Sequence, residues 1–169
     1  MREPERVTCD LPDADATAAL GGALARALCA EAPGHAFLVL DGDLGAGKTT
    51  LARGFLAALG VAGAVRSPTY TLLESYEAAG RPVHHLDWYR LGGWDDLENL
   101  GFRDLQTAPN WLLVEWPERV PEVAAAADLA VRLRHAPAGP AAGRCAELVA
   151  GTAAGRRLLR RLAADSGLG

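Results

Sequence analysis

A glycine-rich segment after a short apolar run constrains the fold of this chain more than any other feature. The run "AFLVL" (36–40) leads into "DGDLGAGKTT", where Gly42, Gly47, Lys48 and Thr49 fill the pattern G-x-x-x-x-G-K-S/T. The overlapping segment "KTTLARGFLAALG" has a helical pattern that ends in a glycine stop signal. A strand, a glycine-rich turn and a helix in this order are typical of a phosphate-binding loop, and they predict an α/β fold.

The predicted loop defines the expected ligand. Its glycines let backbone N–H groups converge on phosphate oxygens, and the next helix adds the positive end of its dipole. We expect Lys48 to contact the β- and γ-phosphates of a nucleotide and the hydroxyl of Thr49 to bind Mg²⁺. Further nucleotide-binding positions are expected along the same loop: Asp43, Leu44, Gly45, Ala46, Gly47 and Thr50.

The use of lysine in this sequence narrows the choice of nucleotide. Lys48 is the only lysine among the 17 lysine and arginine residues. A compact ammonium fits between phosphate oxygens where a planar guanidinium does not. The guanine-specifying motif N-K-x-D of GTPases needs a second lysine, which this sequence lacks. ATP is therefore the expected nucleotide, with Mg²⁺ as its cofactor.

The remaining sequence alternates between helical and extended patterns. We expect one domain over residues 1–169, a P-loop NTPase-like three-layer α/β/α sandwich with a mostly parallel central sheet and some antiparallel strands. Its motif-bearing core covers about 35–135, followed by a C-terminal hairpin and a basic helix over about 128–165. The patterns predict helices at 13–32, 48–60, 94–105, 117–127 and 153–165, and strands at 35–42, 70–78, 83–91, 110–116, 128–135 and 144–151.

Two carboxylates stand where an ATPase needs acidic groups. Glu115 ends the apolar run "WLLVE", and Asp87 ends "VHHLD". Such groups at strand ends beside a phosphate loop hold the metal and orient the attacking water. We take both as metal and catalytic candidates, together with Lys48 as a catalytic candidate. Glu115 as a solvated strand end and Asp87 as the start of a loop are the alternatives. We interpret His85 as strand packing or as a hydrogen-bonding support for Asp87.

Two further motifs are candidates for nucleotide sensing. Ser67 and Thr69 in "SPT" follow the loop helix, where nucleotide switches often place a threonine that senses the γ-phosphate. A proline turn into a strand is the alternative interpretation. Trp116 follows Glu115 and either stacks on the nucleotide or packs in the core.

Composition limits the partners and the environment of the chain. The net charge is −4, so an RNA contact is expected to be local or indirect. The last predicted helix carries a stripe of four arginines, interpreted as a solvated face or as a contact for an acidic partner or RNA phosphates: Arg156, Arg157, Arg160 and Arg161. No apolar stretch approaches the roughly 18 residues that span a bilayer, and three scattered cysteines indicate a reducing compartment. A cytoplasmic location is therefore expected.

Several segments together resemble one family. "GDLGAGKTTLARGFLAALG", "SPTYTLLESY", "HHLDWYRL", "LENLGF" and "LLVEWPER" are similar in order and spacing to the TsaE family, called YjeE in older usage, over about residues 35–135. The resemblance places the phosphate loop on Gly42 to Thr50, the aspartate of H-x-D-x-Y-R on Asp87 and the Walker B-like glutamate on Glu115. It also places Trp116 near the nucleotide and Thr69 at a switch-like position.

The resemblance also implies an activity and partners. A TsaE protein is a small bacterial ATPase needed for the threonylcarbamoyladenosine (t6A) modification beside the anticodon of tRNAs that read codons starting with A. It works with the proteins TsaB and TsaD, contacts tRNA only through their complex, and uses hydrolysis to support turnover of the transferase. Two alternatives stay open from the residues: a small-molecule kinase, and a nucleotide-dependent binding switch without significant hydrolysis.

Overall fold

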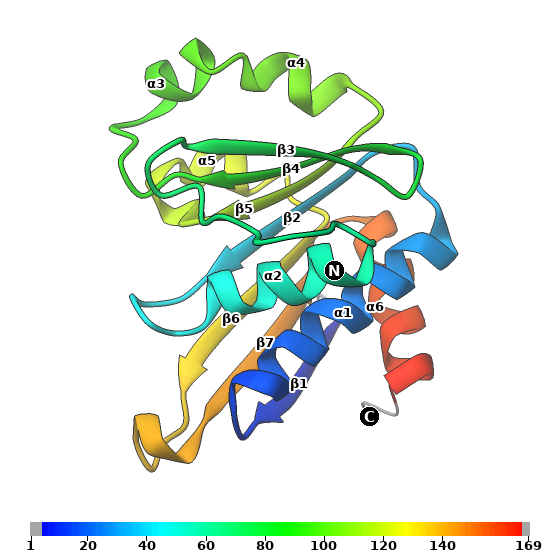
Figure 1. Cartoon of the computed structure of the whole chain (residues 1–169), viewed down its shortest axis with the longest axis vertical. Helices are drawn as coiled ribbons and strands as arrows, with labels where there is room; N and C mark the ends of the chain where they lie inside the picture. Colours follow the sequence, from blue (N-terminus) through cyan, green and yellow to red (C-terminus); the bar gives the residue numbers. More distant parts are fainter. Residues whose placement is uncertain (1–4, 167–169) are drawn as a thin grey trace.

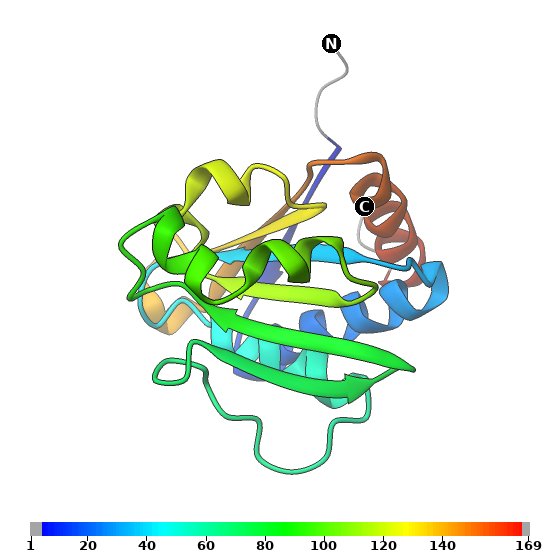
Figure 2. The same cartoon turned by 90° about the horizontal axis from the view of Figure 1, so that it is seen from above.

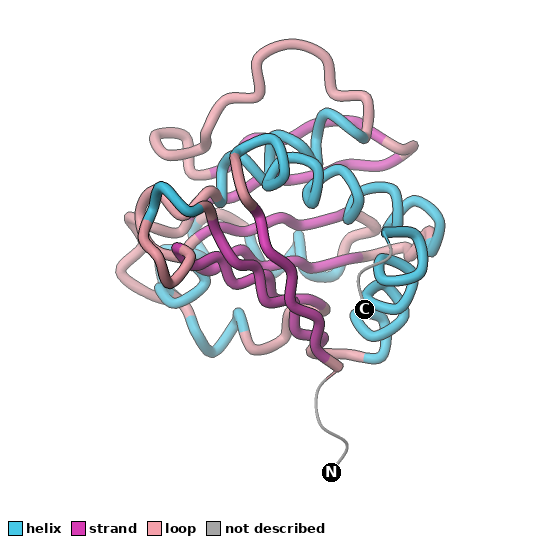
Figure 3. The backbone as a smooth tube through the Cα atoms, turned by 90° about the horizontal axis from the view of Figure 1, so that it is seen from below, coloured by secondary structure: helices cyan, strands magenta, loops and turns pink. Residues whose placement is uncertain are grey.

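The computed structural model describes residues 5–166, which form one seven-stranded sheet with helices on both faces (Figure 1). The strand order is β1-β7-β6-β2-β5-β4-β3. The middle strands β6, β2, β5 and β4 are parallel, and the edges are antiparallel. Figure 3 shows the strands as one twisted layer. The strands are β1 (Arg6–Leu11), β2 (Ala36–Asp41), β3 (Leu73–Ala78), β4 (Arg81–Asp87), β5 (Trp111–Glu115), β6 (Leu129–His135) and β7 (Arg144–Ala150).

The helices form the two outer layers. α1, α2 and α6 share one hydrophobic core with the sheet, and α3, α4 and α5 share the other. This arrangement confirms the predicted three-layer α/β sandwich. No helix within residues 5–166 is both long enough and apolar enough to cross a lipid bilayer. The helices are α1 (Ala14–Glu31), α2 (Lys48–Ala58), α3 (Trp94–Asn99), α4 (Phe102–Thr107), α5 (Pro121–Ala124) and α6 (Ala153–Ser166), with short 3₁₀ turns η1 (Pro117–Arg119) and η2 (Pro140–Ala142).

The central strands are buried on both faces, which explains their unbroken apolar sequences. In β2, Leu38 and Leu40 belong to the core under α1, α2 and α6, whereas Phe37 and Val39 belong to the core under α3, α4 and α5. Trp88, directly after β4, is fully buried in this second core. Because both faces of the central strands are covered, groups of these strands that line an open cavity lie at the strand ends.

The structure corrects three of the predicted elements and adds one strand. The predicted helix over 94–105 is two helices, because Gly101 adopts a left-handed φ of 74° between α3 and α4. The predicted helix over 117–127 is reduced to η1 and α5, and β4 ends at Asp87 instead of continuing to residue 91. Strand β1 is an additional element, which the sequence pattern does not predict because only its last residue is fully buried.

The arginine stripe of α6 lies largely against carboxylates of the same chain. Arg157 and Arg161 approach Glu31 of α1, with Nε to carboxylate oxygen distances of 3.9 Å and 3.5 Å. Nε of Arg160 lies 3.1 Å from Oε1 of Glu5. These internal pairs favour the interpretation of the stripe as a solvated helix face over a dedicated phosphate contact.

Candidate functional site

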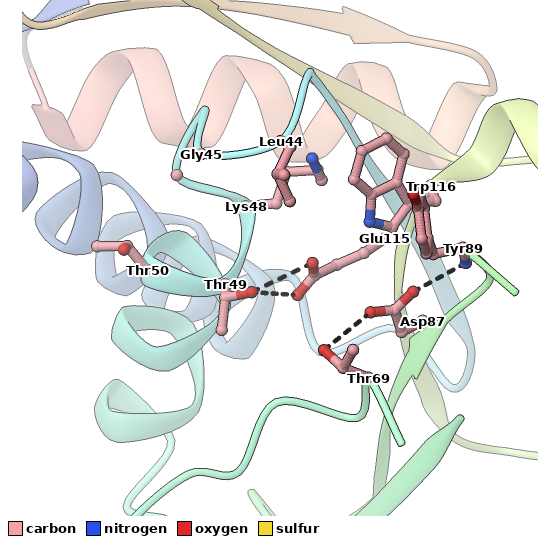
Figure 4. A pocket seen from close by; sticks show the side chains of 11 residues that line it. Leu44, Gly45, Lys48, Thr49, Thr50, Thr69, Asp87, Tyr89, Glu115 and Trp116 are labelled. Carbon is pink, nitrogen blue, oxygen red and sulfur yellow. Dashed lines mark hydrogen bonds between the residues drawn. The ribbon is translucent and has the colours of Figure 1, made fainter. Parts of the chain in front are cut away.

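A cavity of about 380 Å³ lies at the carboxyl ends of β2, β4 and β5, beside the start of α2 (Figure 4). Loops that leave parallel strands meet at this edge of an α/β sheet, which is where such folds bind ligands. The cavity contains hydroxyl, ammonium, carboxylate and aromatic groups. Its lining residues are Leu44, Gly45, Gly47, Lys48, Thr49, Thr50, Thr69, Asp87, Tyr89, Glu115 and Trp116.

Strand register brings the two carboxylates together. Asp87 is the direct neighbour of Glu115 in the parallel β4–β5 pair, and Leu40 of β2 is the neighbour of Glu115 on its other side. Side chains alternate between the faces of a strand, so His85 and Asp87 point to the same face of β4. That face is the one covered by α2, because Val83 and Leu113 at the same alternation belong to the α1, α2 and α6 core.

The loop between β2 and α2 depends on glycine at two positions. Gly42 has φ 154°, and a Cβ there would lie 2.7 Å from the carbonyl oxygen of Leu133. Gly47 caps α2 with φ 108°, and its Cβ would lie 3.2 Å from a methyl carbon of Thr17. Side chains at these positions would be strained and crowded. The loop is therefore packed closely against β6 on one side and α1 on the other.

Lys48 is folded back under this loop. Its Nζ donates a hydrogen bond of 2.9 Å to the carbonyl oxygen of Asp43 and another to that of Gly42. The ammonium also lies 3.7 Å from the ring centroid of Trp116, a cation–π contact. Burial lowers the pKa of Lys48, and the nearby carboxylate of Glu115 opposes this shift. The site thus holds a buried cation at the floor of an otherwise acidic cavity.

Glu115 is held from two sides. Oγ1 of Thr49, in the first turn of α2, lies 3.2 Å and 3.3 Å from the two carboxylate oxygens (Figure 4). Nε2 of His85 lies 2.8 Å from Oε1 of Glu115, and the side chains of both are at most 3% exposed. Of the two interpretations of His85, burial within its strand is confirmed, and hydrogen-bonding support of Asp87 is wrong because the ring contacts Glu115 on the neighbouring strand.

Asp87 makes a separate set of contacts. The backbone N–H of Tyr89 donates to its Oδ1 at 2.8 Å, and Oγ1 of Thr69 lies 3.4 Å from its Oδ2. Oγ of Ser67 lies 2.6 Å from Oγ1 of Thr69. Burial raises the pKa of Asp87, the hydrogen bond from Tyr89 lowers it, and the neighbouring charge of Glu115 raises it further. The "SPT" segment is therefore tied to one of the two carboxylates.

Aromatic side chains form one wall of the cavity. Trp116 adopts a left-handed φ of 62° directly after β5, so the chain turns sharply there. Its ring lies 4.8 Å from that of Tyr89, centroid to centroid, and over Lys48. Trp116 is thus half-buried, lines the cavity and also packs against the core under α3, α4 and α5. Tyr89 also lines the cavity and is not among the predicted site residues, although "DWYR" contains it.

Most predicted site residues lie at this cavity. Three do not line it: Asp43, Ala46 and Ser67. Asp43 contributes its carbonyl oxygen to Lys48 and to the N–H of Ala46, at 2.9 Å and 3.0 Å. Ala46 is a buried residue of the loop, and Ser67 contacts Thr69. Within residues 5–166, no group of three or more His, Cys, Asp or Glu side chains converges as a preformed metal cage.

The strand β2, the glycine-rich loop and the helix α2 place the chain in the P-loop NTPase-like class of α/β folds. A family model described as "Threonylcarbamoyl adenosine biosynthesis protein TsaE" matches residues 11–142. The chain belongs to the TsaE family. This finding confirms the resemblance seen in the sequence motifs.

Individual relatives agree with this assignment. The chain is similar to the tRNA threonylcarbamoyladenosine biosynthesis protein TsaE of Haemophilus influenzae, with 46% identity over 96 residues, covering 57% of this chain and 61% of that protein. The Mycobacterium bovis TsaE is 38% identical over 136 residues, covering 76% of this chain and 79% of that protein. The crystal structure of Bacillus subtilis YdiB superposes with a TM-score of 0.79 at 25% identity, covering 98% of this chain and 99% of that one.

Proposed function

We propose that this chain is a Mg²⁺-dependent ATPase that supports t6A modification of tRNA together with TsaB and TsaD. One observation carries the proposal: the ammonium of Lys48, the hydroxyl of Thr49 and the carboxylates of Asp87 and Glu115 line a single cavity above a G-x-x-x-x-G-K-T loop. The family and the names of its relatives support the role in t6A biosynthesis.

Each group has a chemical role in ATP hydrolysis. Lys48 would bind the β- and γ-phosphates, for which its ammonium must leave the carbonyl oxygens of the loop. Glu115 and Asp87 would orient the water that attacks the γ-phosphorus, so that the bond to the ADP oxygen breaks and inorganic phosphate leaves. Trp116 would change its contact with Lys48 when phosphates bind, because the two side chains now lie together.

The donor set fits Mg²⁺. The oxygens of Thr49, Asp87 and Glu115 are hard ligands, and Mg²⁺ usually takes one or two protein groups, several waters and substrate phosphates. This mode of binding does not need a cage built from protein ligands alone. Bound Mg²⁺ would neutralise charge on the phosphates and hold them in place.

A second candidate, a nucleotide-dependent binding switch, is favoured by the contacts of "SPT". Thr69 bridges Ser67 and Asp87 through its hydroxyl, so a metal or phosphate at Asp87 would compete with that contact. Figure 2 shows the connection between α2 and β3, which carries "SPT", as an extended loop along the edge of the sheet. Such a segment is suited to reorder with the bound nucleotide.

The test compares nucleotide binding with phosphate release. We expect ATP to bind with Mg²⁺, slow release of phosphate by the chain alone, faster release with TsaB and TsaD together, and none with a metal chelator. ATP binding without release under any condition favours the switch. Absence of ATP binding contradicts both functions. Consumption of ATP only in the presence of a small acceptor indicates a kinase.

A further inference from the structure

Arg144 is not among the predicted site residues. It lies in the C-terminal hairpin and contacts the glycine-rich loop. Its Nε donates to the carbonyl oxygen of Ala46 at 3.2 Å, and its Nη2 donates to that of Gly45 at 2.9 Å. Nη1 donates to the carbonyl oxygen of Gly143 at 3.1 Å. One planar guanidinium thus joins two successive peptide groups of the loop to the backbone of the hairpin.

The fold holds Arg144 in place independently of the loop. Arg144 begins β7 and is paired with Leu11 of β1 on one side and with His135 of β6 on the other. Gly143 before it has φ 92°, and a Cβ there would lie 2.4 Å from the carbonyl oxygen of Leu11. The start of β7 is therefore fixed by close backbone packing. The guanidinium that contacts the loop is thus attached to a rigid backbone.

The hydrogen bonds from Arg144 to the loop carbonyls affect where the loop N–H groups point. In a planar trans peptide, the C=O and the N–H point in opposite directions. The N–H that shares a peptide plane with the carbonyl of Ala46 belongs to Gly47, so it points away from Arg144 when this carbonyl is bound. Gly47 lines the candidate nucleotide cavity. The N–H paired with the carbonyl of Gly45 belongs to Ala46 and closes the loop on Asp43 at 3.0 Å.

We propose that Arg144 is a positioning residue that holds the loop in its anion-binding conformation before a nucleotide arrives. This inference rests on the proposed function, because it assigns the held loop to nucleotide phosphates. Holding the loop in advance removes part of the ordering cost from the binding step. Binding two adjacent carbonyl oxygens at once needs two parallel N–H donors in one plane, which a guanidinium has and an ammonium lacks. Lysine at position 144 is therefore an incomplete substitute for arginine.

The variants Arg144→Ala and Arg144→Lys test the inference through two readouts. The first is the set of backbone NMR order parameters of Gly45, Ala46 and Gly47 without nucleotide; rigid backbone gives about 0.85 and flexible backbone gives below about 0.6. The second is the steady-state kinetics of ATP hydrolysis. Arg160→Ala and Arg160→Lys are matched controls, because Arg160 is an arginine of α6 paired with Glu5.

We expect Arg144→Ala to lower the loop order parameters towards the flexible range, and to raise the KM for ATP about tenfold while kcat changes less than twofold. Arg144→Lys should lie between wild type and alanine, and the Arg160 variants should match wild type. A rigid loop with unchanged KM in Arg144→Ala overturns the inference. If Arg144→Ala does not fold, Arg144→Lys provides both readouts. If the wild type binds no ATP, the proposed function fails, and the order parameters still decide whether Arg144 holds the loop.

Discussion

Nε2 of His85 lies 2.8 Å from Oε1 of Glu115, and both side chains are buried. A carboxylate only accepts hydrogen bonds, so Nε2 is the donor in this contact. Nδ1 of His85 has no hydrogen-bond partner within the described residues. Within the described residues, the His85 ring therefore makes one side-chain hydrogen bond, to an oxygen of Glu115, which makes it a positioning residue for that carboxylate.

Replacing His85 should reduce hydrolysis without removing ATP binding. Groups that orient a metal-site ligand typically contribute about 10- to 100-fold to activity, so we expect His85→Leu to lower kcat by about that factor. His85→Gln places an amide N–H near the Nε2 position and should recover part of the loss. His84→Gln is the control, because His84 lies on the same strand and contacts Ser75. Equal kcat values for Leu and Gln at position 85 would contradict the positioning role.

Glu115→Ala should uncouple ATP binding from hydrolysis. Removal of a general base or water-orienting carboxylate costs roughly 100-fold or more in rate, whereas the loop groups that we propose to contact phosphate stay in place. We expect near wild-type affinity for ATP by calorimetry and at least a 100-fold slower release of phosphate. The exposed Glu118, three residues later, supplies the matched control Glu118→Ala. Unchanged turnover in Glu115→Ala would remove this residue from the catalytic set.

Lys48→Ala should weaken triphosphate binding. Lys48 is the only ammonium side chain in the sequence, and a charged hydrogen bond to phosphate is worth more than a neutral one. We expect the Kd for ATP to rise at least about tenfold. The fluorescence of Trp116 should also respond to Lys48→Ala, because the ammonium lies 3.7 Å from its ring centroid. Arg53→Ala on the exposed side of α2 is the control. Equal affinity before and after the change would contradict the phosphate role of Lys48.

Asp87→Asn should stabilise the metal-free and nucleotide-free chain at neutral pH. Burial raises the pKa of Asp87 above its usual 3.8, so the folded chain binds this proton more tightly than the unfolded chain. The contribution of Asp87 to stability is therefore greatest below pH 3.8 and falls as the pH rises through the folded pKa. Urea unfolding across this range should show a larger loss of unfolding free energy for wild type than for Asp87→Asn.

The exposed Asp104 gives the control for that experiment, because Asp104→Asn changes the same charge outside the cavity. A pH dependence of Asp87→Asn that equals that of wild type would show that the ionised carboxylate is not destabilised in the fold. The same variant should lose most Mg²⁺-dependent hydrolysis, because it removes one of the two carboxylates at the cavity. A gain in stability with a loss of activity is the usual signature of such a site.

Local sequence patterns were sufficient for the strand, loop and helix around Lys48 and for the presence of β4 and β5, whereas the end of β4 at Asp87 came from the structure. Each depends on residues that are neighbours in the chain: an apolar run, a glycine pattern or a helical period. The edge strand β1 escaped prediction because its alternation between exposed and half-buried residues leaves a weak pattern. The break at Gly101 shows that one glycine in a helical segment can end a helix.

The sequence by itself determined the class of fold and the residue types at the site, because both depend on local periodicity and on motif spacing. Only the tertiary structure decided their relationships. The pairing of Asp87 with Glu115 and the contact of His85 with Glu115 follow from the register of β4 against β5, which no single strand specifies. Arg144 reaches the loop across 98 and 99 residues of chain, so only the pairing of β7 with β1 and β6 brings it there.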